Sequence, residues 1–180
     1  SAAQRLYEKH KAISYPKTSS RYLSADVLDD VPAIAASLTS QYGTSAQFVV
    51  NLPSLPTDRI IGKVSDHHAL IPTGEIVGSF GEDEKKIFDL IARRFLAVFH
   101  PSAEMQSTRI ETQVKGETFY SRGSIMKKAG WKDVYDRGED KLLPSLLEGE
   151  EVTASGLIRL DKQTQPPNRY SDASLLGAME

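Results

Sequence analysis

Three short stretches of the sequence gather residue types suited to phosphate chemistry, and the first surrounds a tyrosine. Residues 13–23 read Ile-Ser-Tyr-Pro-Lys-Thr-Ser-Ser-Arg-Tyr-Leu, so two cations lie within six residues of Tyr15. A phenol with the ordinary pKa of about 10 is a poor nucleophile, and a reactive tyrosine therefore needs positive charge or a base nearby. Lys17 and Arg21 could supply that charge and also hold a phosphodiester under attack. A tyrosine packed at a helix-to-loop junction is the alternative.

The second stretch places two adjacent histidines in a loop. Residues 65–73 read Ser-Asp-His-His-Ala-Leu-Ile-Pro-Thr. A zinc site is disfavoured, because neighbouring side chains on an extended chain point apart and the sequence has no cysteine to assist. We expect instead that one histidine acts on phosphate as a cationic hydrogen-bond donor. Capping or stabilisation of a turn is the alternative.

The third stretch, residues 166–176, combines a double proline with an arginine and a helix start. It reads Pro-Pro-Asn-Arg-Tyr-Ser-Asp-Ala-Ser-Leu-Leu. Arg169 and the free N–H groups of a helix begun by Ser171 would point in one direction, which suits a phosphate. Packing of Arg169 on Tyr170 would explain the same pattern.

Helices are expected on either side of the tyrosine. Residues 2–11 contain good helix formers and no Gly or Pro, so they predict a helix that ends before Pro16. Ser24 is a suitable N-cap for a second helix over residues 25–38, whose early acidic residues favour a helix N-terminus. Pro32 would lie inside that helix and predicts either a kink or a later start.

The centre of the chain combines an irregular stretch with the strongest helix signal. Residues 43–81 are interrupted by Pro and Gly and predict a loop, with short strands such as residues 46–50. Residues 82–99 predict a long amphipathic helix that ends before Pro101. Its expected core face comprises Ile87, Leu90, Ile91, Phe95 and Val98, widened by Phe88 and Phe99.

The last part of the chain has the pattern of strands. Residues 108–114 and 117–124 alternate on either side of a Lys-Gly pair and predict a hairpin. Residues 152–160 form another alternating run, and residues 171–180 predict a short helix. The expected fold class is therefore α+β, with a boundary at about residue 100 between a helical part and a β-rich part.

Composition excludes several function classes. The 180 residues carry 22 Lys and Arg against 24 Asp and Glu, a formal charge of −2, and no cysteine. Disulfides, thiolate metal sites and a cysteine nucleophile are therefore excluded. No apolar stretch approaches the roughly 18 to 20 residues of a membrane span, so we expect a cytoplasmic protein with no membrane partner. Residues 1–25, with five basic residues against one acidic, could face phosphate or form a solvated helix face.

The three motifs, in this order and with the helix over residues 83–99 before the third, resemble type IA DNA topoisomerases, and within them topoisomerase III. The resemblance covers nearly the whole chain and is weakest over residues 40–60 and 125–155. It implies that Tyr15 attacks a phosphodiester of single-stranded DNA and keeps the 5′-phosphate as a phosphotyrosine while another strand passes. The covalent bond would store the energy of the ester, so religation would need no ATP.

The resemblance also implies roles for polar residues around the tyrosine. By position, Lys17 would stabilise the charged phosphoryl oxygens, His67 would contact a phosphate near the scissile bond, and Arg169 would hold the DNA backbone. Further candidates for DNA contacts are Thr18, Arg21, Ser171 and Ser174.

Two positions depart from the family pattern. Lys17 stands where arginine is usual, and lysine keeps the charge but loses the planar, two-pronged donor for phosphate. Ser19 stands where aspartate is usual. We expect the loss of this acid to change how the loop is anchored or how Arg21 is paired.

The resemblance implies three parts and several partners. Residues 1–100 would form a helical, winged-helix-like domain with the active-site tyrosine, residues 101–162 part of a β-rich arch, and residues 163–180 the start of a further DNA-binding helical segment. Mg²⁺ would be held by a domain of the full-length enzyme outside this sequence, so we expect the chain alone to be an inactive fragment. Single-stranded DNA is the expected partner, a helicase is a candidate partner, and the location would be the nucleoid in the cytoplasm.

A non-catalytic module that binds single-stranded nucleic acid is the competing hypothesis, with Tyr7, Tyr15, Tyr22 and Tyr170 stacking on bases. Replacing Tyr15 with Phe separates the two hypotheses, because stacking survives that change and a covalent adduct does not. Tyrosine recombinase or type IB topoisomerase chemistry is disfavoured. Those enzymes place the tyrosine after their Arg and His residues, whereas Tyr15 precedes them.

Overall fold

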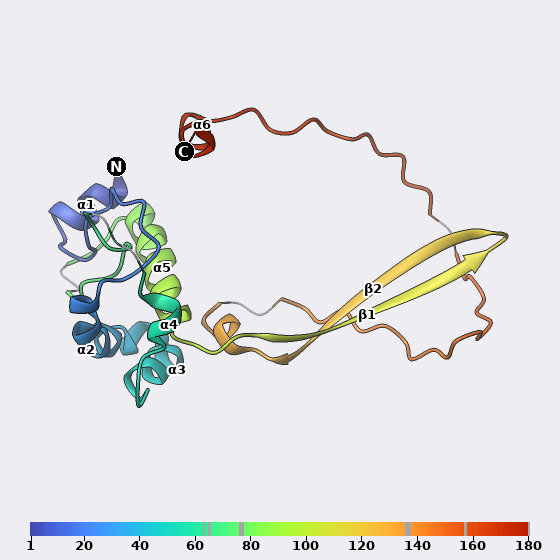
Figure 1. The fold of residues 1–180 in the computed structure, drawn as a ribbon, viewed down its shortest axis with the longest axis horizontal. Helices are drawn as coiled ribbons and strands as arrows, with labels where there is room; N and C mark the ends of the chain where they lie inside the picture. The colour runs from blue at the N-terminus through green and yellow to red at the C-terminus, as the bar shows by residue number, and fades with distance from the viewer. Residues whose placement is uncertain (63, 65, 76–77, 136–137, 157, 180) are drawn as a thin grey trace. The chain divides into compact units, whose positions relative to one another are not determined.

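The computed structural model describes residues 1–62, 64, 66–75, 78–135, 138–156 and 158–179. In chain order the elements are α1 (Ala2–Glu8), η1 (Ala25–Asp30), α2 (Val31–Ser37), α3 (Thr39–Val50), α4 (Thr57–Ile60), α5 (Glu82–Ala97), β1 (Glu104–Val114), β2 (Glu117–Lys128), η2 (Gly130–Val134) and α6 (Asp172–Met179). Helices and an antiparallel sheet in one chain confirm the α+β class. The chain divides into two compact units, Ser1–Leu143 and Pro144–Glu180. Figure 1 shows α1 to α5 gathered into one group and β1 and β2 running side by side.

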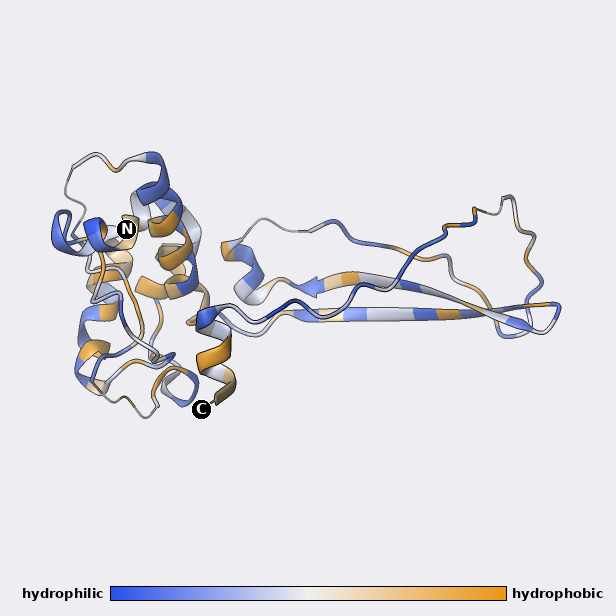
Figure 2. Ribbon diagram, turned by 90° about the horizontal axis from the view of Figure 1, so that it is seen from above, coloured by the Kyte–Doolittle hydropathy of each residue, from blue (hydrophilic) through white to orange (hydrophobic). Residues whose placement is uncertain are grey.

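The helices of the first unit enclose a hydrophobic core, which is the main source of its stability. Figure 2 shows hydrophobic residues concentrated where these helices face one another. Helices α1, α2, α3 and α5 and the loops between them all contribute to it. Its most deeply buried side chains include Leu6, Ile13, Val31, Leu38, Val49, Leu96 and Phe99.

The stretch that the sequence predicts as a loop with a short strand contains a helix. α3 continues through it to Val50, with a break at Gly43, whose φ of 50° and ψ of −123° are not helical. Ala46 and Val49 are buried in the core. The predicted strand over residues 46–50 is therefore wrong. Packing of one apolar face against α2 outweighs the low helix propensity of the Thr, Ser and Gly residues.

The predicted helix over residues 25–38 starts later as an α-helix. The 3₁₀ helix η1 occupies its first part, and Pro32 lies in the first turn of α2, where a missing N–H breaks no helical hydrogen bond. Ser24 is the N-cap residue of η1, as predicted, but its side chain makes no capping hydrogen bond. The Val27 N–H donates to the Ser24 backbone oxygen instead, at 3.2 Å.

α5 confirms the long helix and its expected core face, with one exception. Phe88, Ala92 and Phe95 are buried. Leu90, one of the residues expected on the core face, is 65% exposed. Apolar residues extend around much of this helix, so periodicity alone could not choose between neighbouring faces.

The hairpin after α5 is confirmed and is longer than predicted. Lys115 and Gly116 at its turn both have positive φ angles, 50° and 88°, as a type I′ turn requires. At the other end of the hairpin, η2 packs against α5, and Arg93 Nη1 donates to the Val134 carbonyl at 2.7 Å. The hairpin base is thereby joined to the helices.

In the second unit, α6 confirms the C-terminal helix as far as Met179, and Glu180 lies outside the described residues. Residues 152–156 and 158–160 form no strand, so the third strand prediction is wrong for the residues that can be described. Their side chains are exposed. An alternating run becomes a strand only where a neighbouring strand satisfies its backbone groups.

Candidate active site

The tyrosine segment (residues 13–23) and the histidine segment (residues 66–73) lie antiparallel to one another. Ser14 N–H donates to the Ile71 carbonyl at 2.9 Å, and Ile71 N–H donates to Ser14 Oγ at 3.0 Å. These two residues are 57 positions apart in the sequence. Two loops that the sequence could only describe separately are therefore fixed side by side. Ser65, the first residue of the predicted histidine motif, lies outside the described residues.

This pairing brings Tyr15 into contact with His67. Their ring centroids are 4.5 Å apart and their planes are tilted by 42°. The Tyr15 ring also meets the ring of Tyr7 on α1 edge-on, at 5.5 Å. Thr18 Oγ1 donates to the His67 carbonyl at 3.1 Å and ties the loop after the tyrosine to the histidine. Tyr15 is half-buried and His67 exposed, so a phenol and an imidazole meet at the protein surface.

Hydroxyl groups anchor the loop in which the family pattern would have an aspartate. Ser20 N–H donates to Thr18 Oγ1 at 3.1 Å, and Ser20 Oγ donates to the Tyr22 carbonyl at 3.2 Å. Ser19 and Lys17 are both exposed. Among the described residues Lys17 has no carboxylate partner, so its charge is available to a ligand.

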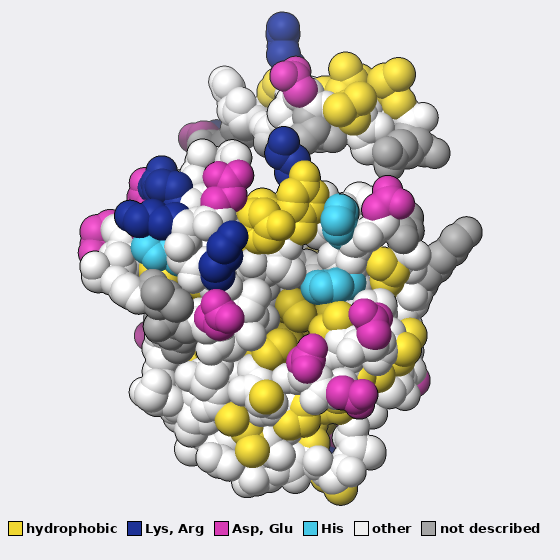
Figure 3. All heavy atoms as spheres, turned by 90° about the vertical axis from the view of Figure 1, so that its left-hand side faces the viewer, with side chains coloured by type: hydrophobic (Ala, Val, Ile, Leu, Met, Phe, Trp, Pro, Cys, Tyr) yellow, Lys and Arg dark blue, Asp and Glu magenta, His cyan; other side chains and the backbone are white. Residues whose placement is uncertain are grey.

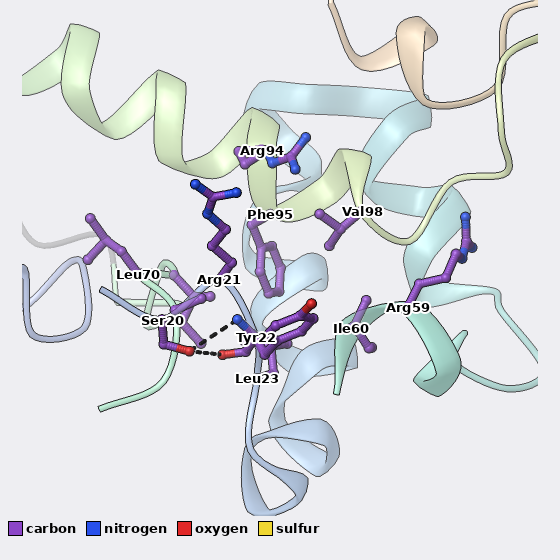
Figure 4. A pocket seen from close by; sticks show the side chains of 12 residues that line it. Ser20, Arg21, Tyr22, Leu23, Arg59, Ile60, Leu70, Arg94, Phe95 and Val98 are labelled. Atoms are coloured by element: carbon purple, nitrogen blue, oxygen red, sulfur yellow. Dashed lines mark hydrogen bonds between the residues drawn. The ribbon is translucent and has the colours of Figure 1, made fainter. Parts of the chain in front are cut away.

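A cavity of about 550 Å³ lies next to this loop, between the tyrosine segment, α4 and α5. Its lining includes Arg21, Tyr22, Arg59, Arg94 and Phe95. Figure 4 shows the Arg21 and Arg94 side chains at one end of the cavity and the rings of Tyr22 and Phe95 near its middle. The sequence analysis named Arg21 but missed the arginines of α4 and α5, because nothing in their local pattern distinguishes them from solvated helix residues.

Charges of both signs are mixed on the face that Figure 3 shows, where basic, acidic and histidine side chains surround exposed hydrophobic ones. Attraction of a polyanion to this face would therefore depend on individual cations rather than on one broad basic field.

Comparison with known sequences identifies the family of the chain. The family model described as DNA topoisomerase matches residues 1–180. The chain belongs to the DNA topoisomerase family. It is 39% identical to DNA topoisomerase 3 of Bacillus subtilis strain 168 over 197 residues, and 39% identical to DNA topoisomerase 3 of Bacillus cereus over 192 residues. These alignments cover 100% and 98% of this chain but 27% and 26% of the two relatives. The predicted resemblance to topoisomerase III within the type IA family is confirmed.

The described residues form no site for the magnesium that the topoisomerase resemblance implies. In that part of the chain, no three His, Asp or Glu side chains come together in a metal-binding arrangement. His68 Nδ1 lies 2.7 Å from the Ala69 carbonyl, whereas the neighbouring His67 ring lies against Tyr15. The two histidines therefore make separate contacts.

The remaining predicted DNA contacts of this topoisomerase chain lie in its second unit. Arg169 is exposed. Ser171 and Ser174 bind one another at the start of α6: Ser174 N–H donates to Ser171 Oγ at 3.3 Å, and Ser171 N–H donates to Ser174 Oγ at 2.9 Å. The contacts described for these serines stay within their own unit. Across the residues that can be described, no helix is long and apolar enough to cross a membrane.

Proposed function

We propose that this chain carries the nucleophile of a type IA DNA topoisomerase. Tyr15 Oη attacks the phosphorus of a phosphodiester in single-stranded DNA. A bond forms between Oη and phosphorus, the bond from phosphorus to the 3′ oxygen breaks, and the phenol proton ends on the released 3′ oxygen. The 5′-phosphate stays on the tyrosine until the reverse reaction reseals the strand without ATP.

The contact between Tyr15 and His67 is the observation that carries this proposal. A protonated imidazole beside the phenol could donate to a phosphate oxygen and meet the charge that develops there. Lys17, exposed two residues after the tyrosine, could contribute a second positive charge. The hydrogen bond from the Thr18 hydroxyl to the His67 carbonyl would hold His67 in place, because it fixes the histidine backbone to the tyrosine loop.

The same contact argues against Tyr15 as a stacking platform. Its ring already contacts the rings of Tyr7 and His67, so less of the ring is open to a DNA base. Stacking by a tyrosine needs an open ring face. Catalysis through the oxygen is therefore favoured over the non-catalytic binding module for this residue.

The wider assignments follow from the family and extend beyond the 180 residues. The chain spans 26–27% of the length of the Bacillus relatives. We therefore propose, for the enzyme that contains it, a winged-helix-like tyrosine domain over residues 1–100, part of an arch over residues 101–162, and a further DNA-binding segment over residues 163–180. Mg²⁺ held elsewhere in that enzyme, a helicase partner and association with the nucleoid complete the proposal.

Replacement of the hydroxyl in a full-length type IA enzyme that carries this chain tests the proposal. Tyr15→Phe keeps the ring contacts and removes the attacking oxygen. Tyr7→Phe is the matched control, because it removes a phenol oxygen from the neighbouring ring. After incubation with a labelled single-stranded oligonucleotide and denaturation, we expect a covalent adduct with the wild type and Tyr7→Phe and none with Tyr15→Phe. An adduct of undiminished amount with Tyr15→Phe would contradict the proposal.

A further inference from the structure

The cavity beside the tyrosine loop has the features of a nucleotide subsite. We propose that it binds one nucleotide of the single strand, next to the phosphate that Tyr15 attacks, with its phosphate on Arg21 and Arg94 and its base against Tyr22. This inference rests on the proposed function and adds to it a binding site with a specified ligand.

Two arginines at one end of the cavity supply the charge. Arg21 comes from the tyrosine segment and Arg94 from the last turn of α5. In the part of the chain that the structure describes, neither guanidinium has a hydrogen-bond acceptor or a carboxylate partner. Two like charges that face one cavity repel each other until an anion lies between them. Guanidinium groups suit a phosphate best, because each can donate two parallel hydrogen bonds to it.

The third arginine at the cavity already makes a hydrogen bond within the protein. Arg59 Nη1 donates to the His100 carbonyl at 3.2 Å. In Figure 4 its side chain lies on the side of the cavity near Ile60, at a distance from the Arg21 end. We therefore assign the phosphate to Arg21 and Arg94 and give Arg59 no direct contact.

Tyr22 provides a fixed aromatic surface inside the cavity. It is 44% exposed, although its ring lies directly against the backbone of Gly62. A Cβ atom at Gly62 would come within 2.4 Å of Tyr22 Cγ, so only glycine allows this position of the ring. The backbone is held as well, since Tyr22 N–H donates to Ser20 Oγ at 3.2 Å. A rigid, exposed ring of this kind is what base stacking requires.

The histidine segment joins this cavity to the candidate active site. His67 contacts the ring of Tyr15, and two residues later the Ala69 N–H donates to the Tyr22 carbonyl at 2.8 Å. An extended chain covers at most about 3.6 Å per residue, so the backbone positions of His67 and Ala69 are separated by no more than about 7 Å. The cavity therefore lies within reach of a nucleotide adjacent to the one that contacts Tyr15.

The chemistry of the cavity selects a nucleotide over other anions. Its volume of about 550 Å³ falls within the range of small-ligand pockets. An acidic peptide or a free phosphate would use the two arginines but would leave the rings of Tyr22 and Phe95 without a partner. A nucleotide of a DNA strand uses both the charge and the aromatic surface.

The first experiment removes each charge and measures single-strand binding by the 180-residue chain. Fluorescence anisotropy with a labelled oligonucleotide would compare Arg21→Gln and Arg94→Gln with Lys86→Gln, an exposed α5 residue outside the cavity lining. Loss of one phosphate contact should lower the slope of log K against log salt concentration by about 0.7. We expect that drop, and weaker binding, for the two arginine variants and not for the lysine variant. Equal effects of all three variants would overturn the phosphate assignment.

The second experiment locates the base. The fluorescent base 2-aminopurine would be placed in turn at each position of the oligonucleotide, and stacking on Tyr22 should quench it at one position only. Tyr22→Ala should remove that quenching and weaken binding about tenfold. Quenching at the same position in Tyr22→Ala would overturn the inference.

The two proposals fail separately. Normal formation of the Tyr15 adduct, together with unchanged DNA binding by the Arg21, Arg94 and Tyr22 variants, would refute the nucleotide subsite and leave the proposed function intact. Position-specific quenching that depends on Tyr22, in an enzyme that never forms the Tyr15 adduct, would instead leave a binding site without the proposed reaction.

Discussion

The Thr18 hydroxyl connects the tyrosine segment to the histidine segment through one hydrogen bond. Thr18→Val keeps the shape and removes both the bond to the His67 carbonyl and the acceptor for Ser20 N–H. We expect a loss of about 0.5–1.5 kcal/mol in the free energy of unfolding, measured by urea denaturation. Adduct formation by the full-length enzyme should also fall, since His67 is no longer held beside Tyr15. Thr18→Ser, which keeps the hydroxyl, should restore both, and a stability equal to wild type in Thr18→Val would refute this role.

Gly62 is required by the ring of Tyr22. Gly62→Ala would place a methyl group within 2.4 Å of that ring, and we expect it to destabilise the chain by about 1–3 kcal/mol, measured by thermal or urea unfolding. The control is the same substitution made in a Tyr22→Ala background. The clash is absent there, so Gly62→Ala should have little effect. If the penalty is the same in both backgrounds, the contact is not its cause.

At the level of single residues, the sequence indicates candidate chemical groups but not which residues lie beside them. Tyr15, Lys17 and His67 were candidates because phenol, ammonium and imidazole groups are recognisable in a sequence. The contact between Tyr15 and His67 could not be derived from spacing, because it depends on pairing between two irregular loops. Arg94 and Gly62 were missed for the same reason, since only the folded chain places them beside Tyr22.

At the level of elements, the buried face of α5 can be tested by paired substitutions. Phe88 is 2% exposed and packs against Phe80, with ring centroids 5.2 Å apart. Phe88→Ala should cost about 3–5 kcal/mol in urea unfolding, because it leaves a cavity in the core. Leu90→Ala, at a position that is 65% exposed, should change stability by less than about 1 kcal/mol. The reverse order would contradict the burial of Phe88 and the exposure of Leu90.

The junction of α1 and α5 gives the fold a dependence on acid pH. The Arg5 guanidinium and the Gly81 N–H hold the pKa of Glu84 at about 2, below the ordinary 4.5. A depressed pKa in the folded state means that the stabilisation is complete above about pH 4.5 and is lost as the pH falls toward 2. Glu84→Gln should therefore show a smaller loss of stability than wild type across this interval, measured by urea midpoints at each pH. If wild type and Glu84→Gln lose the same stability across this pH interval, the lowered pKa of Glu84 is contradicted.

The elements that the sequence predicted correctly are those with strong local signals. In α5, apolar residues recur at helical spacing over many residues. The hairpin has a turn in which Gly116 tolerates a positive φ. α3 was missed because its sequence is rich in weak helix formers and its stability comes from packing on α2. Residues 152–156 and 158–160 show the converse, since alternation alone did not produce a strand there.

At the level of the whole molecule, the 180-residue chain should bind single-stranded DNA without changing DNA topology. The described residues offer no donor set for magnesium, and charge neutralisation by a metal supports most phosphoryl transfer. Purified chain incubated with negatively supercoiled plasmid and magnesium should leave the supercoiled band unchanged on an agarose gel. Relaxation by the chain alone, and its absence in Tyr15→Phe, would show that these residues suffice for the reaction.

The most direct measurement is mass spectrometry of the covalent complex. A full-length enzyme that carries this chain would be trapped on a single-stranded oligonucleotide, digested with protease and nuclease, and sequenced as peptides. We predict a nucleotide joined through its 5′-phosphate to the peptide that contains Tyr15, on the phenol oxygen. A nucleotide attached to any other side chain, or a complex with no covalent bond, would contradict the account.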